Sequence, residues 1–361
     1  MEIPIRLRTS LPLLLAAAGL VATSVYAAAP AGAATNYGLN YPEDIAISGG
    51  DAFVVNSGAS SITEFNINTY ALVRILRGKA YHFGEPGMIV ISGADAFVAA
   101  DSAPSITEFN VATGALVRVL GAKSYGFLAT ALAVDGPDVF VTNFGGGLAG
   151  TPASVTEFNA SSGALVRVLK GASYDFSGPR AITFAGGDGF VVNFGGNSVT
   201  EFNVATGTVV RVLSAKAYGF NWPDSVAISG THGFVVNTDA GGAPNAPPGP
   251  VTEFNVATGA FVRMLTSKSY GFGVAGAVVS SGPDVFISGV KGIVDVNAAS
   301  GAVVHTMHAK RLSTFKGGEL PALGGHHLLV ADPGINTVEE FNITTGNLVL
   351  SITSHPALPS A

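Results

Sequence analysis

The chain contains no cysteine among its 361 residues, and charged residues make up only 12% of it. The absence of thiols excludes disulfide bonds, thiolate metal sites, cysteine nucleophiles and a lipid-modified amino-terminal cysteine. Basic residues are also few, with 18 Lys and Arg against 24 Asp and Glu, and they form no basic run. Nucleic-acid-binding proteins carry clustered basic residues, so no nucleic acid is expected among the partners.

One phrase is repeated seven times along the sequence. In the fifth copy it contains Pro223, an apolar run at 226–228, Phe-Val-Val-Asn at 234–237, Val-Thr-Glu-Phe-Asn at 251–255 and a mostly apolar run at 260–265. Its acidic residue recurs every 42 to 52 residues, at Glu64, Glu108, Glu157, Glu201, Glu253, Asp295 and Glu340. A period of this length is typical of propellers and solenoids.

Each repeat reads as four short strands. In the first repeat, residues 45–47 and 52–55 are continuously apolar, 62–65 alternate, and 72–76 are mostly apolar with one arginine. Continuous apolar runs indicate strands buried on both faces, so the inner strand comes first in each repeat. The sequence therefore predicts an all-β fold, a seven-bladed β-propeller with four antiparallel strands per blade. The repeats begin near residues 42, 86, 129, 179, 223, 275 and 318.

The two ends of the repeat array complement each other. The connector at 218–223 reads Tyr-Gly-Phe-Asn-Trp-Pro, and the segment at 37–42 reads Tyr-Gly-Leu-Asn-Tyr-Pro with no repeat in front of it. The last repeat ends near residue 352 without a connector. We therefore expect residues 35–361 to form one domain, a closed ring in which segment 37–42 supplies the seventh connector. Closure also removes exposed sheet edges, which favour aggregation.

Residues 1–34 have the pattern of a secretory signal peptide. Arg6 and Arg8 precede an apolar stretch at 11–25, and small residues offer cleavage after Ala27 or Ala33. The alternative is a retained membrane anchor, but the apolar run is shorter than the roughly 20 residues that a spanning helix needs. The sequence thus predicts a secreted monomer without stable membrane insertion after cleavage, with cell-surface association left open.

The repeat resembles the NHL and YVTN-type propeller repeats. The resemblance rests on Pro-x-x-Ile-Ala-Ile, Phe-Val-Val-Asn and Ser-Ile-Thr-Glu-Phe-Asn, and it extends from about residue 36 to residue 353. It implies a propeller that serves as a binding platform. Virginiamycin B lyase and gluconolactonase-type enzymes have related folds, but their metal-binding and catalytic motifs cannot be placed on this sequence. Quinoprotein propellers are rich in tryptophan, whereas Trp222 is the only tryptophan here.

Residues that recur in every blade are explained first by the blade itself. A connector Tyr and Phe are expected to fill the gaps between blades rather than to form a glycan platform. The Glu of the third strand and the Arg of the fourth should form exposed ion pairs in five repeats, which contribute about 0–1 kcal/mol each. The arginines are Arg74, Arg118, Arg167, Arg211 and Arg263. An Asn or Asp after each second strand should begin an Asx-turn rather than ligate a metal. These are Asn56, Asp101, Asn143, Asn193, Asn237 and Asp332.

Functional residues should instead differ between blades. The residue after the repeat proline differs from blade to blade, and the seven residues at this position should surround the mouth of the central channel. They are Glu43, Gly87, Thr130, Arg180, Asp224, Gly276 and Glu319. The candidate ligand-binding residues at this mouth are Glu43, Asp44, Glu85, Arg180, Trp222, Asp224 and Glu319. Glu43 and Glu319 fall in adjacent blades, where two carboxylates could hold a cation. The alternative is a solvated rim with one Arg180–Asp224 ion pair.

Two further irregularities stand out. Two loops between second and third strands, at 145–152 and 239–250, are longer than the others, and they should open on the face of the channel mouth. Their length indicates either functional loops or neutral sequence drift in a tolerant position. Five of the seven histidines fall in the last two repeats, but their expected strand positions do not gather them into a metal site. They are His305, His308, His326, His327 and His355.

The leading functional hypothesis is a secreted, non-catalytic platform without a cofactor. Catalysis is not expected because the first strands offer almost no acid, base or nucleophile. The bound partner would be an extracellular protein, a glycan or a cell-wall component. The alternative is a propeller lyase or lactonase that uses calcium or magnesium, held by Glu43 and Glu319 with Glu85 or Asp224 as a further ligand. A structural surface-layer or adhesion component is a third possibility.

Overall fold

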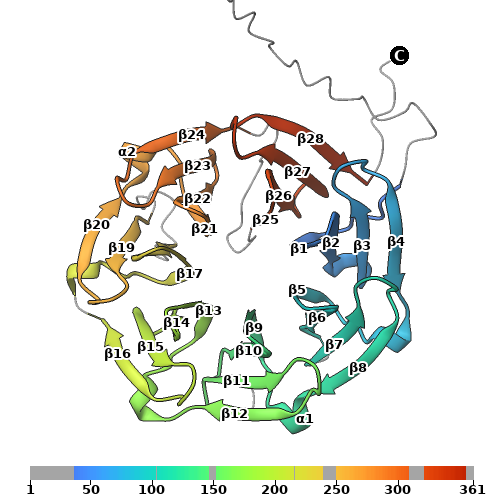
Figure 1. Ribbon diagram of the computed structural model, residues 1–361, viewed down its shortest axis with the longest axis horizontal. Coiled ribbons are helices and arrows are strands. Elements are labelled where there is room, and N and C mark those ends of the chain that lie inside the picture. Colours follow the sequence, from blue (N-terminus) through green and yellow to red (C-terminus); the bar gives the residue numbers. More distant parts are fainter. Residues whose placement is uncertain are drawn as a thin grey trace, which may run out of the picture. The chain divides into compact units, whose positions relative to one another are not determined.

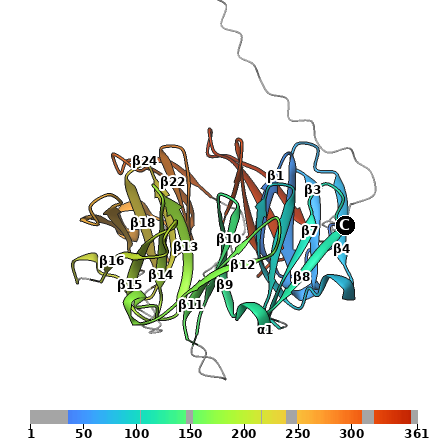
Figure 2. The same cartoon turned by 60° about the horizontal axis from the view of Figure 1, so that its bottom comes forward.

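Residues 36–102, 104–145, 152–214, 216–238, 249–308 and 321–354 are described by a computed structural model. They form seven four-stranded antiparallel sheets, arranged as blades around a central axis (Figure 1). In every blade the strands follow one another in sequence order, and the first strand lies nearest the axis. The predicted fold class is thereby confirmed. Figure 2 shows the ring after rotation, with α1 at one end of the strands. No helix in the described residues is long and apolar enough to cross a membrane.

Blade 1 contains β1 (Pro42–Ser48), β2 (Asp51–Asn56), β3 (Ser61–Asn66) and β4 (Leu72–Arg77). Blade 2 contains β5 (Pro86–Ser92), β6 (Asp95–Ala100), β7 (Ser105–Asn110) and β8 (Leu116–Gly121). Blade 3 contains β9 (Ala129–Asp135), β10 (Asp138–Asn143), β11 (Ser154–Asn159) and β12 (Leu165–Leu169). Blade 4 contains β13 (Pro179–Ala185), β14 (Asp188–Asn193), β15 (Ser198–Asn203) and β16 (Val209–Leu213).

Blade 5 contains β17 (Pro223–Ser229), β18 (His232–Asn237), β19 (Val251–Asn255) and β20 (Phe261–Leu265). Blade 6 contains β21 (Ala275–Ser281), β22 (Asp284–Gly289), β23 (Gly292–Asn297) and β24 (Val303–Met307). Blade 7 contains β25 (Ala322–Gly324), β26 (His327–Asp332), β27 (Thr337–Asn342) and β28 (Leu348–Thr353). The short helices α1 (Ala122–Tyr125) and α2 (Ser267–Tyr270) lie in connectors, and one-turn 3₁₀ helices occur at Ser57–Ala59, Lys79–Tyr81, Ala172–Tyr174 and Lys216–Tyr218.

The hydrophobic core lies between neighbouring blades. Phe53 and Val55 of β2 pack with Ile89 of β5 and Val98 of β6, and the ring of Phe109 in β7 lies 6.1 Å from that of Phe53. Continuous apolar runs therefore arise because both faces of the second strand contact a blade. Burial of one such side chain stabilises the fold by about 1.5–3 kcal/mol.

The ring closes between blades 1 and 7, as the sequence predicts. Leu39 and Val54 of blade 1 share a buried cluster with Leu329 and Val338 of blade 7. Tyr37 takes the place of a connector tyrosine, since its hydroxyl donates to the Tyr70 carbonyl over 2.6 Å. In blade 2, Tyr81 donates to the Gly114 carbonyl over the same distance. Every blade is built from consecutive strands, so the chain ends meet without exchanging a strand.

The connector aromatic residues fill the gaps between blades, which confirms that prediction. Tyr81 stacks on Phe83 at a ring distance of 5.0 Å, and both pack in the core shared by blades 1 and 2. The same stacking recurs for Tyr125 with Phe127, Tyr174 with Phe176 and Tyr218 with Phe220.

The expected Asx-turns are wrong for the four asparagines after second strands. Asn143 is buried, its side-chain oxygen accepts from the Leu128 amide over 2.8 Å, and its Nδ2 donates to Thr156 Oγ1 over 3.0 Å. The amide side chain is needed because it bridges a connector N–H group and a third-strand hydroxyl. Corresponding bonds are formed by Asn56, Asn193 and Asn237. Only Asp332 accepts a bond of the Asx type among these six positions, from the Gly334 amide over 2.9 Å.

The predicted Glu–Arg pairs form within the outer hairpins of blades 1 to 5, but their carboxylates are buried rather than exposed. Arg118 Nε lies 2.7 Å from Glu108 Oε2, and the Glu108 side chain is 0% exposed. Arg118 also donates to the Ser161 carbonyl of the next blade over 2.6 Å. The pair is buried because it lies under the turn of the neighbouring blade. In blade 6, His305 replaces the arginine and lies 3.2 Å from Asp295.

The described histidines have separate partners and form no cluster. His327 contacts Glu340, His326 contacts Thr344, and His308 contacts the Lys291 carbonyl. Within the described part of the chain, no group of three or more His, Asp or Glu side chains is arranged to hold a metal ion. His355 lies outside the described residues.

Candidate functional site

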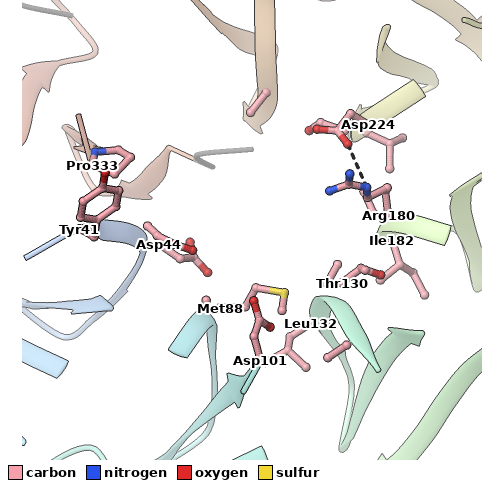
Figure 3. Close-up of a pocket in the computed structure, with 18 residues that line it drawn as sticks. Tyr41, Asp44, Met88, Asp101, Thr130, Leu132, Arg180, Ile182, Asp224 and Pro333 are labelled. Atoms are coloured by element: carbon pink, nitrogen blue, oxygen red, sulfur yellow. Dashed lines mark ion pairs between the residues drawn. The ribbon is translucent and has the colours of Figure 1, made fainter. Parts of the chain in front are cut away.

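A cavity of about 460 Å³ occupies the mouth of the central channel. It lies on the face where first strands begin and second strands end, because Pro42 at the start of β1 pairs with Asn56 at the end of β2. The connectors arrive on the same face, which we call the connector face. Most of the lining comes from first strands, and Pro333 of blade 7 also contributes (Figure 3).

In five blades a β-bulge places the variable residue of the first strand in this cavity. In β1, pairing with β2 skips Glu43, and in β13 pairing with β14 skips Arg180. A bulged residue leaves the ladder, and its side chain is redirected. Of the seven predicted rim positions, five line the cavity: Glu43, Gly87, Thr130, Arg180 and Asp224. Gly276 is not part of the lining, and Glu319 lies outside the described residues.

One side of the cavity is a carboxylate wall formed by Glu43, Asp44 and Asp101. Glu43 Oε1 accepts from the Ser57 hydroxyl over 2.6 Å. Asp44 accepts from its neighbour's amide, Ile45, and from the Ile89 amide of blade 2, each over 2.8 Å. Burial, opposed by the two amide bonds and aided by the negative charge of Glu43, raises the pKa of Asp44 to about 7.

Asp101 is the member of this wall that sequence reasoning misses. It was grouped with the six Asx-turn positions, yet it lines the cavity, as Figure 3 shows. Burial raises its pKa, and the charges of Glu43 and Glu85 add to the effect. A Cβ atom at Gly87 would lie 3.6 Å from both Glu43 Oε2 and Asp101 Oδ2, so both carboxylates lie next to this glycine. The signal in the sequence is the acid itself, which stands where four other blades have asparagine.

The opposite side is an arginine wall formed by Arg180 and Asp224. Arg180 Nε lies 3.5 Å from Asp224 Oδ1, so this predicted pair is formed. The guanidinium carbon also lies 4.7 Å from the centre of the Phe194 ring and 5.8 Å from that of Phe144. Such contacts hold the guanidinium plane in place by cation–π attraction. Burial raises the pKa of Asp224, and Arg180 opposes that change.

Glu85 and Trp222 lie on the rim, outside the cavity lining. Both precede a repeat proline and have positive φ angles of 50°, as does Tyr41 at 51°. Non-glycine residues seldom adopt this conformation, and here the Trp222 amide is fixed by a 2.7 Å bond to Asn197 Oδ1. Trp222 is 43% exposed and lies edge-on to Phe194 at 4.9 Å. The rim therefore presents aromatic surface next to the arginine wall.

A smaller groove of about 290 Å³ extends the cavity between blades 2 and 3. Asp101 and Thr130 line both the cavity and the groove. The exposed side chains of Leu128 and Phe144 line the groove but not the main cavity. The floor of the main cavity includes Met88 and Leu132. The site thus combines charged walls with an apolar base, which suits the binding of a small organic ligand. Residues 146–151 and 239–248, most of the two long loops, lie outside the described residues.

No protein-family model and no curated protein sequence matches this chain. Solved structures do resemble it. A chain of Kuenenia stuttgartiensis hydrazine synthase superposes with a TM-score of 0.65 at 14% identity, covering 86% of this chain and 98% of that one. A protein of unknown function from Desulfotomaculum acetoxidans gives 0.63 at 14% identity, covering 84% and 95%. At this identity the likeness shows the propeller fold alone.

Proposed function

We propose that this protein is an extracellular, non-catalytic binding protein with NHL/YVTN-type repeats that holds its ligand at the channel mouth. The observation that carries the proposal is the position of the mouth cavity, where the irregular residues of five blades meet. Residues common to the blades are occupied in holding the ring together, as the Glu108–Arg118 pair and Asn143 illustrate. Of the irregular residues, Thr130 and the Arg180–Asp224 pair also link neighbouring blades, whereas the only described partner of the Glu43 side chain, Ser57, lies in its own blade. Binding is therefore the function that the carboxylate side of the cavity fits best.

The connector face also has the composition of a recognition surface. Trp222 and Tyr41 are exposed on the rim. Arg180 is partly exposed and contacts the same Phe194 ring as Trp222, whereas Tyr41 lies across the cavity (Figure 3). Tryptophan, tyrosine and arginine are the residues that most often carry binding energy at protein interfaces. An extracellular protein, a glycan or a cell-wall component would meet this rim before entering the cavity.

The proposal can be tested by co-sedimentation of the mature chain with cell envelopes from the producing organism. The double variant Arg180→Met/Asp101→Asn should bind at least tenfold more weakly than the wild type. The control Asn68→Ala changes an exposed turn on the opposite face and should bind as the wild type does. Absence of sedimentation by the wild type, or equal loss in both variants, would contradict the proposal.

A cation-dependent lyase or lactonase is the second candidate, favoured by the three carboxylates that Glu43, Asp44 and Asp101 bring to one cavity, although these three are not arranged to hold a metal ion in the structure described. Carboxylate oxygens are the ligands that calcium prefers. Millimolar calcium or magnesium should then raise the melting temperature of the wild type, and Glu43→Ala should abolish the rise. An unchanged melting temperature in both metals would remove this candidate.

A further inference from the structure

The charged groups of the mouth cavity are incompletely paired on both walls. Arg180 makes one polar contact with a described residue, from Nε to Asp224, and no described residue accepts a hydrogen bond from its two Nη groups. The stacking on Phe194 fixes the plane of the guanidinium. Its forked end is therefore oriented and free to donate. Such a fork matches the two oxygens of a carboxylate.

The carboxylate wall has no positive partner among the residues that the structure describes. No described residue donates a hydrogen bond to the side chain of Asp101 or forms an ion pair with it, and Glu43 receives one bond, from Ser57. The ion pairs among described residues, apart from Arg180–Asp224, all lie in the blades, with their arginine or histidine bound to a third-strand acid. An ammonium group, with three donors and a positive charge, complements this wall.

The two walls face each other across an apolar floor. Figure 3 shows Asp101 and Asp44 on one side of the cavity and Arg180 on the other, with Met88 and Leu132 between them. A ligand that satisfies both walls carries an amine at one end, a carboxylate at the other and an apolar body. A volume of about 460 Å³ lies within the range of small-molecule sites, so such a ligand fits in size.

We propose that the mouth cavity binds a short zwitterionic peptide, with its free amino end at Glu43 and Asp101 and its free carboxyl end on the fork of Arg180. The inference rests on the proposed binding function and specifies its ligand class. Hydrogen bonds to charged groups contribute about 1.5–3 kcal/mol, so removal of one end group should weaken binding about 10- to 100-fold.

The test uses Ala-Leu and Ala-Leu-Ala as probes, each also prepared with an acetylated amino end, an amidated carboxyl end, or both. Trp222, the only tryptophan in the chain, lies on the rim and reports binding by its fluorescence. Calorimetry supplies a readout that is independent of the rim. The free peptides should bind best, each blocked end should cost at least tenfold, and the doubly blocked peptides should bind most weakly.

Two single variants assign the ends. In Arg180→Met, amidation of the carboxyl end should no longer weaken peptide binding, whereas acetylation of the amino end still should. In Asp101→Asn, acetylation should no longer weaken binding, whereas amidation still should. Asparagine occupies the position of Asp101 in four other blades, and melting curves will verify that both variants fold. Equal binding of free and doubly blocked peptides, or no binding of any probe at 10 mM, would overturn the ligand class. Envelope binding through the mouth would still stand in that case, so the two failures are distinguishable.

Discussion

At the scale of single residues, the position after the second strand shows how one substitution changes a role. Asparagine at this position accepts from a connector amide and donates to a threonine hydroxyl, as Asn143 does. Aspartate has no donor when it is ionised, so it cannot bridge both groups. Asp101 instead lines the channel mouth. A repeated structural position has thereby become available to a binding site in blade 2.

The buried asparagines should be important for stability. Asn143→Ala leaves the Leu128 amide without its acceptor and removes the bond that the Thr156 hydroxyl accepts, although that hydroxyl still donates to the Tyr125 carbonyl. An unsatisfied buried group costs about 1–3 kcal/mol. We expect the free energy of unfolding in urea to fall by about 2 kcal/mol. Asn68→Ala, in an exposed turn, should change it by less than about 0.5 kcal/mol. Equal effects of the two substitutions would contradict the bridging role.

Asp44 should make stability depend on pH. Its carboxyl has a pKa of about 7 in the folded chain against an ordinary 3.8, owing first to burial and then to the charge of Glu43. The folded chain therefore keeps a proton that the unfolded chain releases, and the stability contributed by Asp44 falls as pH rises from about 4 to 7. The melting temperature of Asp44→Asn minus that of the wild type should therefore be larger at pH 8 than at pH 5. A difference that is constant over this range would refute the assignment.

At the scale of elements, each outer hairpin is tied to the blade that follows it. Arg118 joins β8 to Glu108 of β7 and to the Ser161 carbonyl in the next blade. Arg74 makes the corresponding contacts with Glu64 and the Ala112 carbonyl. The guanidinium serves as a bridge between blades because it has enough donors for both partners. The ring thus gains a repeated polar contact at its outer edge.

Removal of one partner of this pair should cost more than removal of both. Arg118→Met leaves the buried Glu108 carboxylate without its cation, and burial already raises the pKa of Glu108. We expect a loss of about 3 kcal/mol in the free energy of unfolding at pH 8. The double variant Arg118→Met/Glu108→Gln should recover part of that loss, because no buried charge remains. If the loss in the double variant equals the sum of the losses in Arg118→Met and Glu108→Gln, measured by urea unfolding, the uncompensated charge is not the cause.

The sequence predicts the elements well because every blade repeats the same packing problem. Periodicity reveals the four strands, the connector aromatics and the ring closure through Tyr37. It also identifies Glu43 and Arg180 as irregular rim residues. It does not reveal that the hairpin glutamates are buried, since that depends on the turn of the next blade. Asp101 is missed for a related reason: its position in the repeat suggests a turn, and only the fold brings it beside Glu43.

At the scale of the whole molecule, ring closure depends on non-covalent contacts between chain ends. The Tyr41 amide donates to Asn336 Oδ1 over 2.6 Å, and the Tyr70 hydroxyl donates to Glu340 across the same junction. The chain has no cysteine to reinforce it. The cavity walls belong to different blades, so closure also sets the distance between Glu43 and Arg180. Binding at the mouth and stability of the ring are therefore coupled properties.

Blade 7 should be the first part of the ring to open. Its first strand β25 spans Ala322–Gly324, whereas the first strands of the other blades have seven residues. The register aligns Pro321 with Ile45 of β1, whose amide donates to Asp44 Oδ1, so proline removes no ladder bond at this position. Within the described residues, the inner side of β26 pairs with β25 at three positions, whereas that of β14 pairs with β13 at six.

Hydrogen exchange measured by mass spectrometry can detect this difference. Amides at 330–332 in β26 should exchange at least tenfold faster than those at 191–193 in β14, after correction for intrinsic rates, since local opening limits exchange. Equal protection of the two segments in the wild type would show that the short strand does not set the weakest point. Faster exchange in blade 4 would place that point away from the junction.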